Sequence, residues 1–488
     1  GGTKVFTRIR KEDGIAMVAV VGVVALISAV AMGGFVLSRQ VLHESVRVER
    51  ESKAFQVAQS GMDRELATFA PDKLTDGFLE KTGRTEDGTY TITVEPAGGT
   101  ADPLFGEYLL TSTGEASGAS ESVSMNFFYI DLWNMNIGGG ENASIGGGRG
   151  FNGNATITGP LYIRGNMEWS SNANYEGGPL FIKDGHLEVT GSGTLGKLKP
   201  IKCYITNGAF GNKIGNLYPD GPISSSVPDI ELPWVDAAYM STKYDLAKEE
   251  SADQLMGSAS RAIANTTEVT TLGNPSTYGG SGPVATPAST SAFYKYIGAS
   301  TGPKALGAGT TNLTIGATSF GRWEGNGYPA ASGLHDDFAF NAATGTLYVE
   351  GTVFIDGVLT LGENVRNYVG NGTLVVNNNV FIFGDLLPKT ALSAEEALGI
   401  VTPGNVTIGE SNNTAHFKGG IFANGVVGLY GAAGADPTWV EGAILCGVIY
   451  GDKPNLNIHM NPLLSAAGVE SLPGSGGGIV YQGTWSRN

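Results

Sequence analysis

The sequence predicts an α+β protein that is mostly β: a long N-terminal α-helix, a small antiparallel sheet, and a large parallel β-helix or solenoid domain. Three observations support this class. An apolar run near the N-terminus continues into an amphipathic helical pattern, strand-like segments lie between residues 88 and 133, and short apolar runs broken by Gly, Asn and Asp-Gly recur beyond residue 135. We expect four segments: a basic segment at residues 1–14, the long helix at 15–75, the small sheet at 76–134 and the β-helix domain at 135–488.

The apolar run extends from Ile15 to Leu37 and contains no charged residue. As a helix it would be about 35 Å long, enough to cross a bilayer core of about 30 Å. It is longer than the apolar region of a signal peptide, which usually spans about 7–15 residues. A signal peptide is therefore the weakest interpretation, and we expect a helix that inserts in the membrane.

The helical pattern continues beyond the apolar run. Apolar residues recur at steps of three and four, with charged residues on the other side of the helix. The residues of this stripe are Phe55, Ala58, Met62, Leu66 and Phe69. This spacing is typical of an amphipathic helix that buries one face. We expect one helix from about Ile15 to Ala70, whose second half packs on the following domain.

A cluster of basic residues stands immediately before the apolar run. Its members are Lys4, Arg8, Arg10 and Lys11. The positive-inside rule keeps such a cluster in the cytoplasm and sends the rest of the chain outward. The sequence thus predicts a membrane-inserted precursor whose β-rich part faces the outside of the cell.

Small residues repeat at four-residue steps inside the apolar run, at Ala25, Ala29 and Gly33. Such a stripe lets helix backbones approach closely where lipid gives no hydrophobic driving force. The alternative is that Ala and Gly are simply common in membrane helices. The pair Gly33-Gly34 costs about 2 kcal/mol relative to alanine in a helix interior. We expect the stripe to pack against other helices and the glycine pair to mark a flexible point.

Two segments of this helix are RKEDGIAMVAVVGVVALISAVAMGGFVLSRQ and ESKAFQVAQSGMDREL. They resemble the type IV pilin-like proteins, especially the PilX-like branch. YLLTSTGEASGASESVSMNFFY and the C-terminal GGGIVYQGTWSRN resemble that branch more loosely. The resemblance implies a basic leader that ends at Gly14, an apolar helix that forms a filament core, and a small pilin-like sheet. Major pilins carry a glutamate four residues after the mature N-terminus; counted from Ile15, this chain has Ala19 there.

The composition argues against nucleic-acid binding. The net charge is −16, whereas surfaces that bind nucleic acid cluster Lys and Arg. The two cysteines, Cys203 and Cys446, lie in strand-like apolar stretches. Buried free thiols are the simpler interpretation, and a disulfide between them is the alternative in an oxidising compartment. Since the sequence has no metal-ligand spacing of Cys or His, we expect no metal and no cofactor.

Beyond Asn136 the chain repeats one pattern, seen in GTLYVEGTVFIDGVLTLG and GTLVVNNNVFIFGD. The strands follow one another too closely for ordinary hairpins, which favours a parallel β-helix with Asn377, Asn378 and Asn379 as stacked turn residues. A β-sandwich is the alternative, because it also predicts many short strands. Residues 220–340 interrupt the pattern, and we interpret them as an inserted lobe folded onto the head.

Two segments invite a catalytic interpretation. IGGGENASIGGGRGFNGN is as rich in glycine as a phosphate-binding loop, but the helix that such a loop requires does not follow. LHDDFAF offers His335, Asp336 and Asp337 in a fold that hosts polysaccharide-cleaving enzymes. Adjacent aspartates on a strand point to opposite sides, so a solvated loop is the simpler interpretation. We expect a structural protein and not an enzyme.

The sequence therefore predicts a structural subunit of a type IV pilus-like surface filament. We expect a homo-oligomer that polymerises through the N-terminal helix, after a membrane-inserted stage and with the help of pilus assembly machinery. The β-helix head would be displayed at the cell surface. The alternative function is a membrane-anchored carbohydrate-active β-helix enzyme or adhesin.

Overall fold

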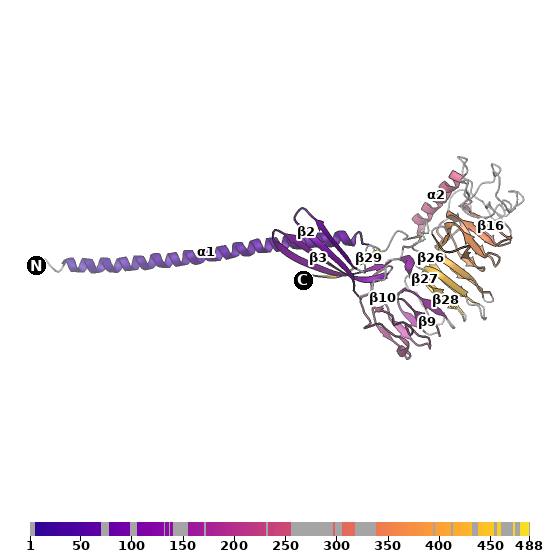
Figure 1. The fold of residues 1–488 in the computed structure, drawn as a ribbon, viewed down its shortest axis with the longest axis horizontal. Helices are drawn as coiled ribbons and strands as arrows, with labels where there is room; N and C mark the ends of the chain where they lie inside the picture. The colour runs from indigo at the N-terminus through magenta and orange to yellow at the C-terminus, as the bar shows by residue number, and fades with distance from the viewer. Residues whose placement is uncertain are drawn as a thin grey trace. The chain divides into compact units, whose positions relative to one another are not determined.

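The computed structural model contains two compact units (Figure 1). The first consists of Gly1–Phe127 and Gln482–Asn488, and the second of Phe128–Tyr481. The residues that the structure describes are 5–69, 78–97, 105–130, 132–135, 137–139, 155–169, 172–230, 233–254, 296–297, 305–317, 338–393, 396–410, 413–431, 438–452, 456–459, 472–473 and 479–487.

The first unit begins with one continuous helix, α1 (Val5–Leu66), of 62 residues. It starts earlier than the predicted Ile15, because the basic segment before the apolar run contains no proline and continues the helix. It ends at Leu66 and not at Ala70. Pro71 follows in the sequence, and a proline disfavours helical backbone at the residue before it.

A five-stranded sheet completes the first unit, with the strand order β1-β2-β3-β4-β29. Its strands are β1 (Leu79–Arg84), β2 (Thr89–Pro96), β3 (Phe105–Ala116), β4 (Ala119–Ile130) and β29 (Ile479–Arg487). β2 pairs antiparallel with both β1 and β3. The sequence predicted the three middle strands but not the largely exposed edge strand β1. It also placed residues 135–488 in the head, whereas β29 returns to this sheet.

The second unit is a parallel β-solenoid, as predicted. Within the described residues its strands form sheets of 17, four and three members, and neighbouring strands pair in parallel except in the hairpin formed by β16 and β17. The β-sandwich alternative is therefore wrong. The strands are β5 (Ile137–Gly139), β6 (Thr156–Thr158), β7 (Leu161–Arg164), β8 (Met167–Trp169), β9 (Asn174–Glu176), β10 (Leu180–Lys183), β11 (Leu187–Val189), β12 (Cys203–Ile205), β13 (Ala209–Phe210), β14 (Tyr296–Ile297), β15 (Thr311–Ile315), β16 (Phe338–Asn341), β17 (Thr346–Val349), β18 (Gly351–Ile355), β19 (Gly357–Leu361), β20 (Asn367–Val369), β21 (Asn371–Val376), β22 (Val380–Ile382), β23 (Leu387–Pro388), β24 (Ala397–Thr402), β25 (Val406–Ile408), β26 (His416–Tyr430), β27 (Thr438–Asp452) and β28 (Leu456–His459).

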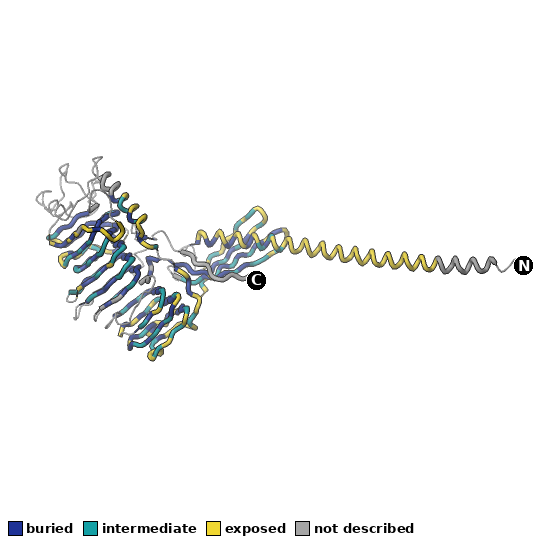
Figure 2. Tube along the Cα trace, turned by 180° about the vertical axis from the view of Figure 1, so that it is seen from behind, coloured by how far each residue is buried: buried dark blue, intermediate teal, exposed yellow. Residues whose placement is uncertain are grey.

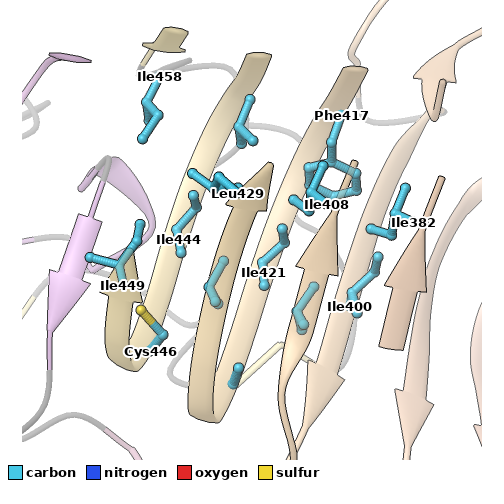
Figure 3. Close-up of a cluster of buried hydrophobic side chains, with 14 of the residues drawn as sticks. Ile382, Ile400, Ile408, Phe417, Ile421, Leu429, Ile444, Cys446, Ile449 and Ile458 are labelled. Atoms are coloured by element: carbon cyan, nitrogen blue, oxygen red, sulfur yellow. The ribbon is translucent and has the colours of Figure 1, made fainter. Parts of the chain in front are cut away.

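The solenoid core consists of ladders of identical or similar apolar side chains (Figure 3). In one ladder Ile400, Ile421 and Ile444 occupy the same register position on β24, β26 and β27, and all three are fully buried. Parallel strands lie about 4.8 Å apart, so each isoleucine packs on its equivalent in the next coil. This stacking explains why the sequence repeats short apolar runs without needing a strict period.

The coils do not follow the order of the chain. β5 lies between β27 on one side and β7 on the other, and from there β10 and β12 lead to one end of the solenoid. The chain resumes at the other end with β14 and β15 and returns through β18, β21, β24, β26 and β27. Figure 1 shows the result: β26–β28 lie between β9 and β10 at one end and β16 at the other. We call β5–β13 the first arm and β14–β28 the second arm.

The predicted inserted lobe at 220–340 is described only in part, because residues 255–295, 298–304 and 318–337 lie outside the described residues. Part of that range, β14 and β15, belongs to the solenoid itself. Residues 225–230 and 233–254, which we call the strap, run over the outside of both arms and include α2 (Ala237–Gln254). The Tyr162 hydroxyl on β7 donates to the Pro228 carbonyl and accepts from the Ile230 amide. Further along the strap, Tyr244 packs edge-on against Phe354 of β18.

The predicted asparagine turn forms stacked corners of the second arm. The Asn379 side chain accepts a hydrogen bond from the Asn405 amide, 2.9 Å away, and the Asn405 side chain accepts one from the Val426 amide at 2.7 Å. Asn377 is fully buried and donates to Asp356 Oδ1 at 2.8 Å. These side chains satisfy backbone groups at each turn, where the strand ladder cannot.

Candidate assembly surface

The first half of α1 carries a large apolar surface that nothing in the described part of the chain covers. The large apolar side chains from Met17 to Leu37 are 50–74% exposed. Figure 2 shows this half of the helix as exposed along its length. Among the described residues, α1 is the one helix long and apolar enough to cross a membrane, and none of its apolar window is buried.

The predicted stripe of Ala25, Ala29 and Gly33 lies within this exposed surface. A Cβ built at Gly33 meets nothing within 4 Å. Gly22 is equally open and lies three residues before Ala25, which puts it on the same side of the helix. Four-residue steps alone do not include Gly22, whereas a helix face alternates steps of three and four.

The helix continues without interruption through Gly33 and Gly34. The glycine pair therefore does not interrupt the helix. Both glycines keep helical backbone, so their cost of about 1 kcal/mol each is not enough to break a helix of this length. The proposed flexibility at this point stays a prediction.

The orientation cluster lies mostly outside what the structure describes. Lys4 is outside the described residues. Arg8, Arg10 and Lys11 lie on α1, where the structure describes their backbone alone. Their role in orientation stays a prediction from the sequence.

The second half of α1 packs on the sheet of its own unit through one continuous face. Its buried residues follow helical spacing and are Ala54, Val57, Ala58, Gly61, Met62, Glu65 and Leu66. Beyond the helix, Phe69 contacts the rings of Tyr108 and Phe127. The sequence predicted this face correctly except at Phe55, which is half-buried at its margin. The small residue Ala54 takes the buried position because the helix approaches the sheet closely there.

Glycines permit that close approach. A Cβ at Gly114 of β3 would lie 2.3 Å from the Ala54 carbonyl oxygen and 2.4 Å from the Ala58 amide nitrogen. A Cβ at Gly61 would lie 2.7 Å from the Tyr90 ring. The backbone of α1 therefore rests almost directly on β3, a contact that the sequence pattern alone does not reveal.

An ion pair with one buried partner, Glu65, joins the helix to the edge strand of the sheet. Glu65 is 1% exposed, and its Oε2 accepts a hydrogen bond from Lys81 Nζ on β1 at 2.9 Å. The Lys81 side chain is itself 49% exposed, so it is the loss of Lys81 that would be costly, because the buried Glu65 carboxylate would lose its charge partner. The sequence alone does not reveal this pair, since Glu65 looks like one more charged residue on an amphipathic helix.

The two cysteines are buried free thiols and do not form the alternative disulfide. Cys203 aligns through Leu180, Leu161 and Ile137 with Ile444, which lies on the same strand as Cys446. Four strand spacings of about 4.8 Å separate these positions, whereas a disulfide needs Cα atoms within about 7 Å. Burial raises the pKa of each thiol to about 12.

The candidate catalytic residues His335, Asp336 and Asp337 lie outside the described residues. Of the glycine-rich segment, residues 137–154, the structure describes only Ile137–Gly139, as strand β5. The described residues contain no group of three or more His, Cys, Asp and Glu side chains that could hold a metal ion.

The chain matches no protein-family model and no curated protein sequence. Among solved structures it is similar to the competence-associated pilin ComZ from Thermus thermophilus, with 16% sequence identity and a TM-score of 0.42. The match covers 90% of this chain and 97% of that chain.

Proposed function

We propose that the protein is a structural subunit of a type IV pilus-like surface filament, which polymerises through α1 and displays the β-solenoid. The observation that supports this most directly is the contrast between the two halves of one unbroken helix. The second half buries its apolar face on its own sheet, whereas the half from Met17 to Leu37 is exposed. Soluble proteins rarely expose an apolar surface of this size. Identical helices of other subunits are the partner that we propose.

The same helix fits a membrane-inserted precursor. Ile15–Leu37 is long enough to span a bilayer, and the basic residues before it keep the N-terminus in the cytoplasm. In this proposal, pilus assembly machinery moves the subunit from the membrane into the filament. The filament then carries the solenoid head at the cell surface.

A permanent membrane anchor is the second candidate function, because length and hydrophobicity alone satisfy it. The two functions make different demands on the stripe of small residues. An anchor requires only that its side chains tolerate lipid, and leucine does so as well as alanine. A filament core packed through the stripe requires that the side chains stay small.

A matched pair of substitutions separates the two functions. Ala29→Leu enlarges a side chain on the stripe, and Ala31→Leu makes the same change about 160° around the helix. Overpacking costs about 1–3 kcal/mol, so we expect Ala29→Leu to lower filament yield about tenfold or more while the subunit accumulates in the membrane. Ala31→Leu should assemble as the wild type does. Equal assembly of both variants would reject the stripe as the packing surface.

We also propose that the head has a structural and not a catalytic role. A screen of the purified protein against common glycans tests this. The proposal predicts no depolymerisation above a heat-denatured control. Robust turnover that is lost in Asp336→Asn or Asp337→Asn would establish the enzyme alternative instead.

A further inference from the structure

The first arm ends in residues 195–224, which form its last two coils and which we call the end coils. Three isolated parallel bridges join these coils to each other: Leu195 to Leu217, Ile201 to Pro219 and Tyr204 to Ser224. In the described part of the chain, no strand pairs with the outer side of the second coil. Residues 212–215 and 218–222 are accordingly exposed. The solenoid therefore has a free end here.

The end coils expose apolar side chains of a size that the rest of the solenoid mostly buries. In the described part of the second unit, the exposed large apolar side chains are Leu198, Phe210, Ile214, Tyr218, Trp234 and Leu306. The first four belong to the end coils. Single exposed apolar residues are normal on a protein surface, whereas a concentration of them at one end of a domain indicates an interaction surface.

The most exposed of these side chains belongs to a loop that is held in place. Leu198 is 87% exposed, and the amides of Leu198 and Lys199 donate to the Glu176 carboxylate at 3.2–3.3 Å. Gly196 begins the loop with φ at 78°, a conformation that favours glycine. The backbone of the loop is therefore fixed while the leucine side chain stays in solvent.

The end coils are basic in an acidic protein. Their charged residues are Lys197, Lys199, Lys202 and Lys213, all exposed, and one acidic residue, Asp220. Four positive charges and one negative charge give the end coils a net charge of +3, whereas the whole chain carries −16. Lys197 and Lys199 flank Leu198, and Lys213 precedes Ile214. Both of these exposed aliphatic side chains therefore lie next to a positive charge.

We propose that the end coils dock the head on the surface of an anionic phospholipid membrane. Apolar side chains flanked by lysines suit such a surface, because the apolar groups enter the boundary between headgroups and acyl chains while the lysines attract the anionic headgroups. The long lysine side chains reach the headgroups even where Leu198 lies deeper. The proposal concerns the second unit alone, so it holds whether α1 packs in a filament or anchors the chain.

A nucleic acid is the alternative polyanion, and the residue types argue against it. The end coils contain no arginine, whose planar side chain binds phosphate through two parallel hydrogen bonds and stacks on rings. Leu198 and Ile214 have no ring on which a base could stack, whereas sites for single strands rely on aromatic side chains. Aliphatic side chains beside lysines therefore favour a lipid surface.

The test uses the full-length protein held by α1 in nanodiscs of phosphatidylcholine, so that lipid already covers the apolar helix. Leu198→Cys carries the environment-sensitive dye NBD, and the native thiols stay unlabelled at neutral pH, because both are buried. Vesicles with about one third phosphatidylglycerol are then added. We expect the NBD emission to rise about twofold or more and to shift to the blue as the dye enters lipid. Unchanged emission would overturn the proposal.

Two controls separate docking from insertion of the dye itself. NBD at Asn312→Cys, an exposed position on β15 of the second arm, should not respond to the same vesicles. Vesicles of pure phosphatidylcholine should give little response at either position, because they lack the charge that attracts lysine. Equal responses at both positions, or equal responses to both lipids, would contradict docking through the end coils.

A matched pair of charge reversals tests the lysines. Lys199→Glu in the end coils and Lys389→Glu at an exposed position after β23 change the net charge equally. Lys199→Glu should raise the vesicle concentration for half-maximal NBD response about tenfold or more, and Lys389→Glu should leave it unchanged. Equal effects would overturn the proposal, because net charge alone would then govern binding. Binding of single-stranded DNA without binding of vesicles would assign the surface to nucleic acid instead.

Discussion

At the scale of single residues, glycine and alanine decide how close α1 comes to its neighbours. Inside the chain, Gly114 and Ala54 let the second half of α1 rest on β3. On the exposed half, Gly22, Ala25, Ala29 and Gly33 offer a similar surface to another helix. Small residues therefore permit the observed contact of α1 with β3 in one half and the proposed contact with another helix in the other half.

Gly114→Ala tests the observed contact. Its Cβ would collide with backbone atoms of α1 and not with a flexible side chain, so the helix must move. We expect faster hydrogen exchange of the amides from Ala54 to Leu66. The increase should correspond to a loss of about 1–3 kcal/mol in the free energy of opening this segment. Gly33→Ala is the control, because its Cβ meets nothing within 4 Å, and exchange in the same segment should not change. Unchanged exchange in Gly114→Ala would contradict the close packing described here.

The buried thiols predict how stability depends on pH. Their pKa of about 12 in the folded protein lies above the ordinary thiol value near 8.5. The folded state therefore holds these protons more tightly, and the resulting stability is present below about pH 8.5 and lost as the pH rises toward 12. Between pH 7.5 and 9.5, we expect the free energy of unfolding to fall by about 1 kcal/mol for each thiol, because the thiol ionises only in the unfolded chain. Urea titration should show this loss in the wild type and a smaller loss in Cys203→Ala/Cys446→Ala; equal losses would contradict the assignment.

Residue-level features were only partly predictable. The sequence identified Met62, Leu66 and Phe69 as buried, because apolar side chains at helical spacing need a partner surface. It could not identify the Glu65–Lys81 pair or the contact at Gly114, since both depend on which strand lies under the helix. It also assigned Phe55 to the buried face, where the close approach of β3 favours Ala54.

At the scale of elements, the turns of the solenoid, like its strands, are held by hydrogen bonds between particular residues. Asn377 is fully buried, accepts from the Gly307 amide at 2.9 Å, and donates to Asp356 Oδ1 and to the Ala305 carbonyl. It therefore connects the turn after β21 to the turn after β18 and to the segment before β15. The asparagine run in the sequence was enough to predict stacked turns, although not these partners.

Asn377→Ala should destabilise the second arm. The change removes three hydrogen bonds from a buried corner, which corresponds to a loss of about 2–3 kcal/mol. Asn312→Ala, on an exposed position of β15, should change the unfolding free energy by less than about 0.5 kcal/mol. Thermal unfolding followed by circular dichroism compares the two variants. A loss in Asn312→Ala as large as in Asn377→Ala would show that the corner contacts are not specific.

At the scale of the whole chain, local pattern and global order carry different information. Periodic apolar runs and glycine turns predicted a parallel solenoid, because every coil repeats the same local requirement. They did not predict that the chain begins this domain in its middle, because any coil can stack on any other of matching shape. For the same reason, β14 and β15 were assigned to a lobe and β29 to the head.

The central claim is that α1 forms the core of a filament built from this chain. Electron cryomicroscopy of material sheared from the cell surface tests it most directly. The account predicts filaments of the 50.6 kDa chain, with α1 helices in contact through Ala25, Ala29 and Gly33 at the centre and solenoid heads outside. Sheared material without such filaments, with the protein recovered instead as single subunits in the membrane fraction, would contradict it.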